Sequence, residues 1–434
     1  MRLLPIQPTR ERELGVVWKK RLGSAKFIHQ KSHSKCLVCM LTIMVLMVGM
    51  LPLLAQTQPV SEPRLEIYGY VMTDFGYDID QINPDWFDVM RPSKLPSFHD
   101  EFGHNGRTFA GVRQTRNGIK GYLPTKYGEL MTWFEFDVFG TGVDDGQTTF
   151  HLRHAYGELG HFGAGQTWSP FMDPDIFPNS LEYWGPNGAA NFRNVQVRWM
   201  PLQGDTSVTL ALERPGSTQD GGLLRDRLEV QNILGRFQFP DVSGAIKTGG
   251  NWGYVRAAAI GGNTKLDDVV NDQFNLDDSV ARWGVNLTSN IKTGGKNVFK
   301  LGYVFGHGME NYMSDAPVDI APEPNFGNPT KPIIGKALPF HSLSAFYDYY
   351  WNDRWSTSLG YSQLAVANTV LQRPADFKRG QYALINLLWY PDENVMVGGE
   401  FQWGRRANFS DGFRVNDYKV QFSFRFNYSA KIPR

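Results

Sequence analysis

The chain has 434 residues, with 44 Lys and Arg against 43 Asp and Glu, 45 Gly and an aromatic fraction of 14%. The balanced charge gives no basic surface for nucleic acid, and the negative mean hydropathy argues against a bundle of membrane-spanning helices. The length fits two or three soluble domains or one large β-barrel. The high Gly and aromatic content favours the barrel.

Residues 37–55 form the one continuously apolar run, and a stretch rich in Lys and Arg precedes it. A basic region, an apolar region and a small residue, Ala55, together predict a secretory signal peptide over residues 1–55. A single transmembrane anchor is the alternative, because the run approaches the length that spans a bilayer.

The chain that follows the predicted cleavage site differs from the full sequence in two ways. Both cysteines, Cys36 and Cys39, lie before the site, so no disulfide, thiolate metal site or catalytic cysteine is expected. Cleavage also removes nine of the 44 basic and two of the 43 acidic residues, which leaves 35 against 41. The polar residues 56–63 predict a short flexible lead-in to one domain over residues 64–434.

Apolar and polar residues alternate along this domain from Leu65 onwards. Between Val420 and Tyr428, five apolar residues at even positions alternate with Gln, Ser, Arg and Asn. Strand side chains change face at every residue, so each such segment predicts a strand with one apolar and one polar face. Strands of about ten residues can cross a bilayer at a tilt, although a soluble sandwich also shows alternation. Further segments of this kind are Leu65–Phe75, Leu130–Val138, Val195–Trp199, Val208–Leu212 and Val395–Trp403.

The predicted connections alternate between short and long. Short turns are expected at residues 124–128, 160–161, 201–205, 248–251, 293–296, 351–354 and 391–394. Longer loops are expected at residues 78–106, 140–148, 168–192, 214–235, 262–279, 308–339, 368–379 and 405–416. Seven short and eight long connections imply sixteen strands. Because a bilayer requires every backbone group to be paired, we predict an all-β, antiparallel transmembrane barrel that closes on itself.

The third long connection is the candidate for narrowing such a barrel, because sixteen strands enclose a lumen too wide for side chains to fill. Four prolines stiffen it, and we expect it to fold inward. It carries three acidic residues, while the neighbouring strands and the exit of the loop supply arginines. Opposed charges across a constriction would create a transverse field that selects polar solutes. The candidate pore-lining residues are Asp173, Asp175, Glu182, Arg116, Arg153, Arg193 and Arg198. The alternative for each is an ordinary solvated side chain.

Several motifs resemble those of the DcaP-like trimeric outer-membrane porins. They are Phe150–Tyr156, Gly165–Phe171, Gly185–Gly188, Arg193–Arg198 and Phe239–Gly244. The resemblance implies sixteen strands, a homotrimer, a third loop that constricts the pore, and passage of small organic anions such as dicarboxylates. By position, Arg153, Arg193 and Arg198 match the arginines of the family's motifs. Two features depart from what the resemblance implies. The lead-in is too short for the coiled coil of some members, and Ser-Ala-Lys-Ile-Pro-Arg follows Tyr428, whereas many outer-membrane proteins end in an aromatic residue.

Two other classes compete with a porin. In an outer-membrane hydrolase, His151, His154 or His161 would activate Ser169, but no spacing fixes such a pair. A plugged structural or adhesin barrel would share the fold and pass little current. Strict alternation would place His151 and His154 on opposite faces, which argues against a shared metal ion.

We therefore expect a porin rather than an enzyme, without cofactor or metal, located in the bacterial outer membrane. Its expected partners are outer-membrane lipid, lipopolysaccharide and small solutes, and not nucleic acid. The acidic loop over residues 267–278 lacks the pattern of an EF-hand, and we interpret it as a solvated loop that bridges to lipopolysaccharide through divalent ions.

Overall fold

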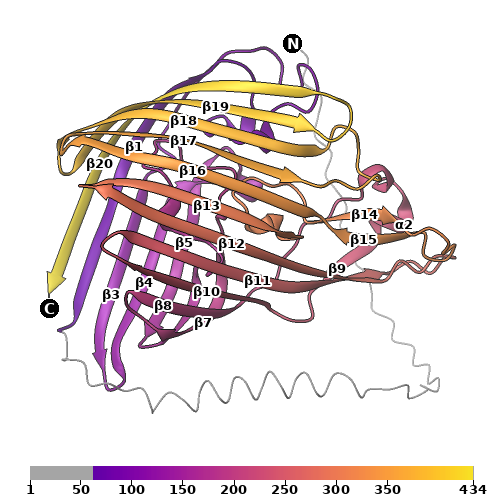
Figure 1. Ribbon diagram of the computed structural model, residues 1–434, viewed down its shortest axis with the longest axis horizontal. Coiled ribbons are helices and arrows are strands. Elements are labelled where there is room, and N and C mark those ends of the chain that lie inside the picture. The colour runs from indigo at the N-terminus through magenta and orange to yellow at the C-terminus, as the bar shows by residue number, and fades with distance from the viewer. Residues whose placement is uncertain (1–61, 434) are drawn as a thin grey trace, which may run out of the picture. The chain divides into compact units, whose positions relative to one another are not determined.

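The computed structural model describes residues 62–433, which form twenty β-strands and a few short helices (Figure 1). The predicted signal peptide and most of the predicted lead-in lie outside the described residues. The first ten strands are β1 (Arg64–Asp78), β2 (Arg107–Gly111), β3 (Arg116–Thr125), β4 (Gly128–Phe139), β5 (Thr148–Leu159), β6 (Phe162–Trp168), β7 (Arg193–Leu202), β8 (Thr206–Glu213), β9 (Ile233–Arg236) and β10 (Asp241–Gly250). The others are β11 (Gly253–Asp268), β12 (Asp278–Gly294), β13 (Asn297–His307), β14 (Ile320–Pro324), β15 (Ile333–Ala337), β16 (Pro339–Asn352), β17 (Trp355–Val366), β18 (Phe377–Asp392), β19 (Val395–Asn408) and β20 (Arg414–Pro433).

Short helices occur only in the connections of the described residues. They are η2 (Pro84–Trp86), η3 (Pro92–Lys94), η4 (Gly142–Asp144), η5 (Pro174–Ile176), η6 (Gly222–Leu224), α2 (Leu228–Gln231) and η7 (Glu310–Tyr312). Within residues 62–433, no helix has the length and apolar character needed to cross a membrane.

Eighteen strands form one antiparallel sheet, and β14 and β15 form a separate hairpin. β2 and β3 both pair with β1, and β9 and β10 both pair with β11, so each of these couples is one interrupted strand. The sheet therefore has sixteen strand positions around the barrel. It closes because β20 pairs with β1 along its whole length, from Arg64 opposite Pro433 to Asp78 opposite Lys419. The prediction of a closed, antiparallel, sixteen-strand barrel is confirmed.

The two rims of the barrel differ in the length of their connections. The start of β1, the end of β20 and seven tight turns lie at one rim, and eight longer loops lie at the other. Some turns require glycine, since Gly128 and Gly204 have φ values of 116° and 124°. Two long loops are shorter than predicted: β11 continues to Asp268, and β19 and β20 continue past the expected boundaries. Polar residues continue the backbone ladder there, so the loss of apolar alternation does not mark the strand end.

The two faces of the sheet have opposite chemistry, as the alternation predicted. In β20, Phe422, Phe424 and Phe426 are 56%, 41% and 53% exposed on the outer surface, while Gln421 and Ser423 are fully buried. Neighbouring strands repeat the pattern. The apolar face therefore points outward, and the polar face points into the barrel.

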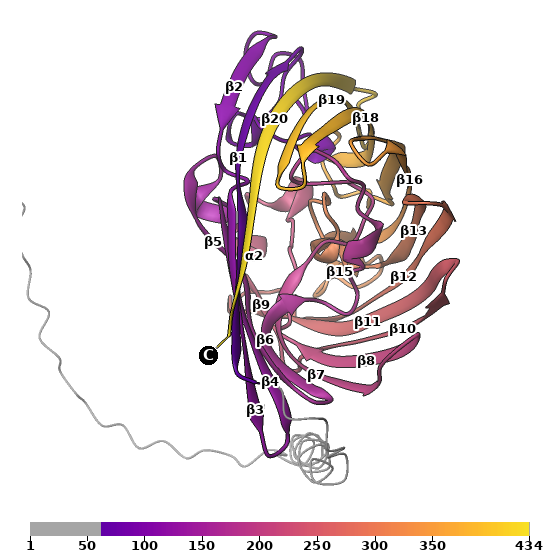
Figure 2. The same ribbon diagram turned by 90° about the vertical axis from the view of Figure 1, so that its left-hand side faces the viewer.

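Long loops cover part of the polar inner face, and in Figure 2 loop segments lie within the ring of strands. Met90 and Leu95, from the β1–β2 loop, pack on Tyr382 and Leu384 of β18. Phe171, from the β6–β7 loop, belongs to a second buried cluster formed with the β13–β14 connection and the adjacent strands. These contacts fix the loops relative to the wall and so shape the space inside.

Candidate functional site

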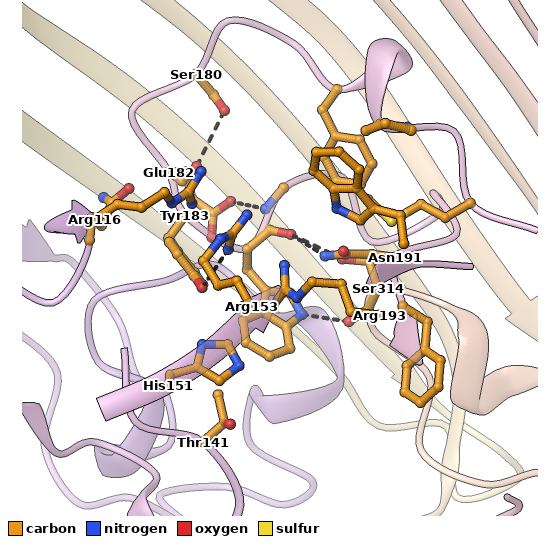
Figure 3. A pocket seen from close by; sticks show the side chains of 18 of the residues that line it. Arg116, Thr141, His151, Arg153, Ser180, Glu182, Tyr183, Asn191, Arg193 and Ser314 are labelled. Carbon is orange, nitrogen blue, oxygen red and sulfur yellow. Dashed lines mark hydrogen bonds between the residues drawn. The ribbon is translucent and has the colours of Figure 1, made fainter. Parts of the chain in front are cut away.

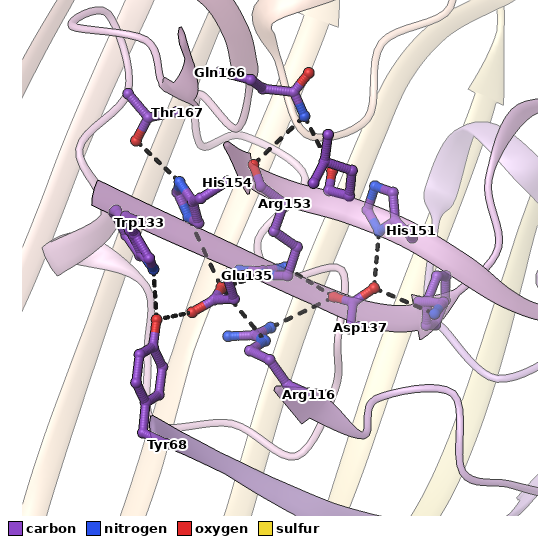
Figure 4. Close-up of polar contacts among 12 residues, drawn as sticks. Tyr68, Arg116, Trp133, Glu135, Asp137, His151, Arg153, His154, Gln166 and Thr167 are labelled. Carbon is purple, nitrogen blue, oxygen red and sulfur yellow. Dashed lines mark hydrogen bonds and ion pairs between the residues drawn. The ribbon is translucent and has the colours of Figure 1, made fainter. Parts of the chain in front are cut away.

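Three neighbouring strands bring two carboxylates and two arginines together on the inner wall (Figure 4). Glu135 and Asp137 lie two residues apart on β4 and face the same side. The Arg153 guanidinium on β5 donates to Glu135 at 2.7 Å and to Asp137 at 3.0 Å. Arg116 on β3 approaches the same two carboxylates at 3.9 and 3.8 Å. Arg153 is only 6% exposed, and the two carboxylates supply the opposite charge for this buried guanidinium.

A β-bulge determines which residues of β5 face inward. Glu135 pairs with His154 and Phe136 pairs with Leu152, so Arg153 is the extra residue on β5. The prediction that His151 and His154 face opposite sides is therefore wrong, because one inserted residue reverses the alternation. His151 contacts Asp137 at 2.8 Å, and the Nε2 atom of His154 lies 3.8 Å from Glu135.

These histidines nevertheless have structural partners. The His154 ring stacks on Trp133 at 3.6 Å, and its Nδ1 atom is 2.9 Å from the Thr167 hydroxyl. Among residues 62–433, no group of three or more His, Cys, Asp or Glu is arranged to hold a metal ion.

The β6–β7 loop, residues 169–192, is tied to distant strands by its acidic residues. Asp173 accepts hydrogen bonds from Tyr254 of β11 at 2.9 Å and Thr288 of β12 at 2.5 Å. Asp175 forms an ion pair with Lys247 of β10 at 3.0 Å. These two acids hold the loop against the wall.

Hydrogen bonds from backbone amides to buried carboxylates fix the second half of the same loop. The Leu181 amide donates to Glu400 of β19 at 2.7 Å. Glu182 accepts from the Met90 amide at 3.1 Å and from the Gly185 amide. The loop also returns to β5, because the Tyr183 hydroxyl donates to Asp137 at 2.6 Å and accepts from Arg153 at 3.2 Å.

Between this loop and the β3–β5 wall lies a cavity of about 610 Å³ (Figure 3). Four of the seven predicted residues line it: Arg116, Arg153, Arg193 and Glu182. The other three do not. Asp173 and Asp175 serve as the tethers described above. Arg198 donates to the Trp168 carbonyl at 2.6 Å and to the Gln196 side chain at 2.8 Å, on β7 outside the lining.

The structure adds lining residues that sequence analysis did not identify, chiefly Arg425, Arg91 and Glu310. Arg425 is on β20, and barrel closure brings it to the same place as Arg116: the Tyr70 ring lies 5.5 Å from one guanidinium and 5.4 Å from the other. Alternation alone puts Arg425 on the polar face. Its position along the barrel axis depends on how the last strand pairs with the first. A local sequence pattern does not reveal this pairing.

Cations outnumber anions on the lining. Within the described residues, Arg193 and Arg425 have no carboxylate within 4.0 Å, and Arg116 has only long contacts. Burial raises the pKa of the Glu182 carboxyl to about 8 and raises the pKa of the Glu310 carboxyl well above its ordinary value, so both acids carry less negative charge than exposed carboxylates would. The cavity therefore presents positive charge to a solute.

A hydrolytic site is not assembled around Ser169. Its hydroxyl donates to Glu213 at 2.7 Å and is almost fully buried. Across the part of the chain that the structure describes, no histidine is hydrogen-bonded to a serine. The group beside this hydroxyl is the Glu213 carboxylate, and the predicted pairing of Ser169 with a histidine does not occur in residues 62–433.

Comparison with known proteins gives one family. Residues 60–428 match the model of the DcaP outer membrane protein family. No curated protein matches the chain.

The solved structures with similar folds include these three. The outer membrane channel DcaP of Acinetobacter baumannii aligns with 21% identity and a TM-score of 0.69, covering 86% of this chain and 100% of its own. An anion-selective porin from Comamonas acidovorans aligns with 11% identity and a TM-score of 0.54, covering 85% and 100%. OmpF of Salmonella typhi, in a complex with daunomycin, aligns with 13% identity and a TM-score of 0.50, covering 84% and 97%.

Proposed function

The chain belongs to the DcaP outer membrane protein family, and from this premise we propose that it is a passive diffusion channel that favours small organic anions such as dicarboxylates. Its place is the bacterial outer membrane. Barrels of this membrane turn their short connections to the periplasm and their long loops to the outside. The long-loop rim described above is then the extracellular one, and the apolar outer face contacts lipid.

The β6–β7 loop is the proposed constriction. Its contacts with β10, β11, β12 and β19 support an inward fold, since the partners on these four strands are inner-face side chains. The cavity between this loop and the β3–β5 wall would be the narrow part of the pore. Solutes would pass close to the arginines that line it.

The preference for anions rests on one observation: Arg193 and Arg425 face the cavity without a carboxylate partner among residues 62–433, while burial raises the pKa of both lining acids. A dicarboxylate could contact two guanidinium groups at once, and each pairing allows two parallel hydrogen bonds. The transverse field between opposed acids and bases, which the sequence predicted, has less support. Asp173 and Asp175 hold the loop against the wall, and the lining charges without a carboxylate partner among the described residues are those of Arg193 and Arg425.

The experiment is the reversal potential of the reconstituted channel in a salt gradient, followed by conductance block with a dicarboxylate. An anion-selective potential, and a block that is stronger for the dicarboxylate than for its monocarboxylate analogue, are expected. A cation-selective potential would contradict the proposal.

A homotrimer is part of the same proposal, and its support is the likeness of the motifs to those of a trimeric porin family. Light scattering of the detergent-solubilised chain tests it, because a trimer and a monomer differ threefold in protein mass. We propose no enzymatic activity, because no histidine of the described residues is hydrogen-bonded to Ser169, whose hydroxyl is almost fully buried. Incubation with ester and phospholipid substrates should give no turnover.

A further inference from the structure

Four cations gather on the outer wall where β18, β19 and β20 reach the long-loop rim. Lys378, Arg379, Arg405 and Arg414 line one hollow of about 470 Å³. β18 and β19 run side by side in Figure 1, and β20 pairs with β19 through Ala407 opposite Arg414. The three arginines of this cationic outer-wall site lie on the outer face, because Arg379 and Arg405 alternate with buried residues and Arg414 shares the exposed face of Tyr418.

Strand register explains how three strands build the site. Arg379 of β18 and Arg414 of β20 both lie opposite Ala407 of β19. Adjacent strands are about 4.8 Å apart, so the two arginine backbones are about 10 Å apart with a single methyl group between them. Arg405 lies two residues from Ala407 on the same face. A small central residue flanked by guanidinium groups leaves room for a compact anion.

The site lies directly beyond the apolar part of the wall. Two residues from Arg405, Trp403 pairs with Tyr418, whose ring stacks on the Phe401 ring with centroids 6.1 Å apart. Two residues farther from the long-loop rim, Phe401 pairs with Ile385, and these side chains are 41% and 52% exposed. Successive rows are about 7 Å apart. Aromatic rings prefer the headgroup level, so the cations lie at the height of the headgroups or just beyond it.

The positive charge of the site is not neutralised by the protein. None of the four cations forms an ion pair within residues 62–433. Asp411, the acid of the β19–β20 loop, forms no ion pair with these cations; its carboxylate accepts hydrogen bonds from the Asn408 side chain at 3.0 Å and the Phe413 amide at 2.8 Å. Four cations without ion pairs, next to an apolar wall, fit an anion that also carries apolar chains better than they fit a fully water-soluble anion.

We propose that this cationic outer-wall site binds the phosphate groups of lipid A in the outer leaflet of the membrane. The acyl chains would lie along the apolar rows, and the guanidinium groups would hold phosphate oxygens through paired hydrogen bonds. This inference goes beyond the channel function. It depends on the long loops facing outward, and not on the identity of the transported solute.

The test is titration of the full, detergent-solubilised chain with three probes, with bound lipid counted by native mass spectrometry. The probes are lipid A with both phosphates, lipid A with the phosphates removed, and inorganic phosphate. The triple variant Arg379→Gln/Arg405→Gln/Arg414→Gln should bind phosphorylated lipid A about tenfold or more weakly. Removing the phosphates should abolish the difference between wild type and variant.

Two further variants make the test specific. Arg354→Gln is the matched control, because Arg354 is an exposed arginine on a tight turn at the opposite rim, and it should bind like wild type. Ala407→Glu places a carboxylate between Arg379 and Arg414 and should weaken binding while every arginine remains.

The channel itself provides the folding control. Single-channel conductance of both site variants should match wild type, so a failure of this inference is distinct from a failure of the pore. Undiminished binding of phosphorylated lipid A by the triple variant would overturn the proposal. So would inorganic phosphate that competes as well as lipid A does, because that result would indicate a site for free anions.

Discussion

Removing the charge of Arg425 should reduce the anion preference of the channel. A unit charge about 5 Å from a permeating anion contributes about 0.8 kcal/mol in bulk water and about 3 kcal/mol at an effective dielectric constant near 20. A wet lumen lies nearer the first limit, so we take about 1 kcal/mol. That energy corresponds to about a fivefold loss of anion occupancy in Arg425→Gln.

The assay is the reversal potential in a planar bilayer under a potassium chloride gradient, measured for wild type and Arg425→Gln. Arg193→Gln should shift the potential in the same direction, because Arg193 also lacks a carboxylate partner among the described residues. Arg405→Gln is the control: it removes an identical charge from the outer wall and should leave the potential unchanged. If both lining variants keep the wild-type potential, the argument from unpaired arginines is refuted.

Three further predictions concern the network and the loop. Arg153→Ala leaves Glu135 and Asp137 buried without their main partner, so it should lower the free energy of unfolding by about 3–5 kcal/mol in urea titration. Raising the pH through about 8 ionises Glu182 and adds negative charge to the cavity. Anion preference should therefore fall between pH 7 and 9, and it should stay constant there in Glu182→Gln. Asp173→Ala removes the acceptor for two hydrogen bonds that hold the loop. Single-channel traces should then show larger current noise, and unaltered noise would argue against the tether.

Much of the fold is contained in local sequence patterns. The two-residue period of segments such as Val420–Tyr428 identifies strands, and it also predicts which face is exposed, as Phe422 and Gln421 show. Turn residues between these segments give the number of strands. Closure then follows from the need to pair every backbone group in a bilayer.

The site was less predictable, because it depends on register and on contacts between distant segments. The single extra residue at Arg153 reverses the faces of β5, and nothing in the local sequence marks it. Arg425 joins the cavity only through the pairing of β20 with β1. The roles of Asp173 and Asp175 as tethers also depend on partners on β10–β12, far along the chain.

The central claim is that the apolar outer face meets lipid while the polar inner face encloses a water-filled path. Single-channel recording after reconstitution of the purified chain, with residues 1–55 removed, tests it most directly. We predict stepwise, ohmic conductance increments whose amplitude scales with salt concentration and whose reversal potential favours anions. A chain that stays folded and monodisperse in buffer without detergent, and that adds no current to the bilayer, would contradict the claim.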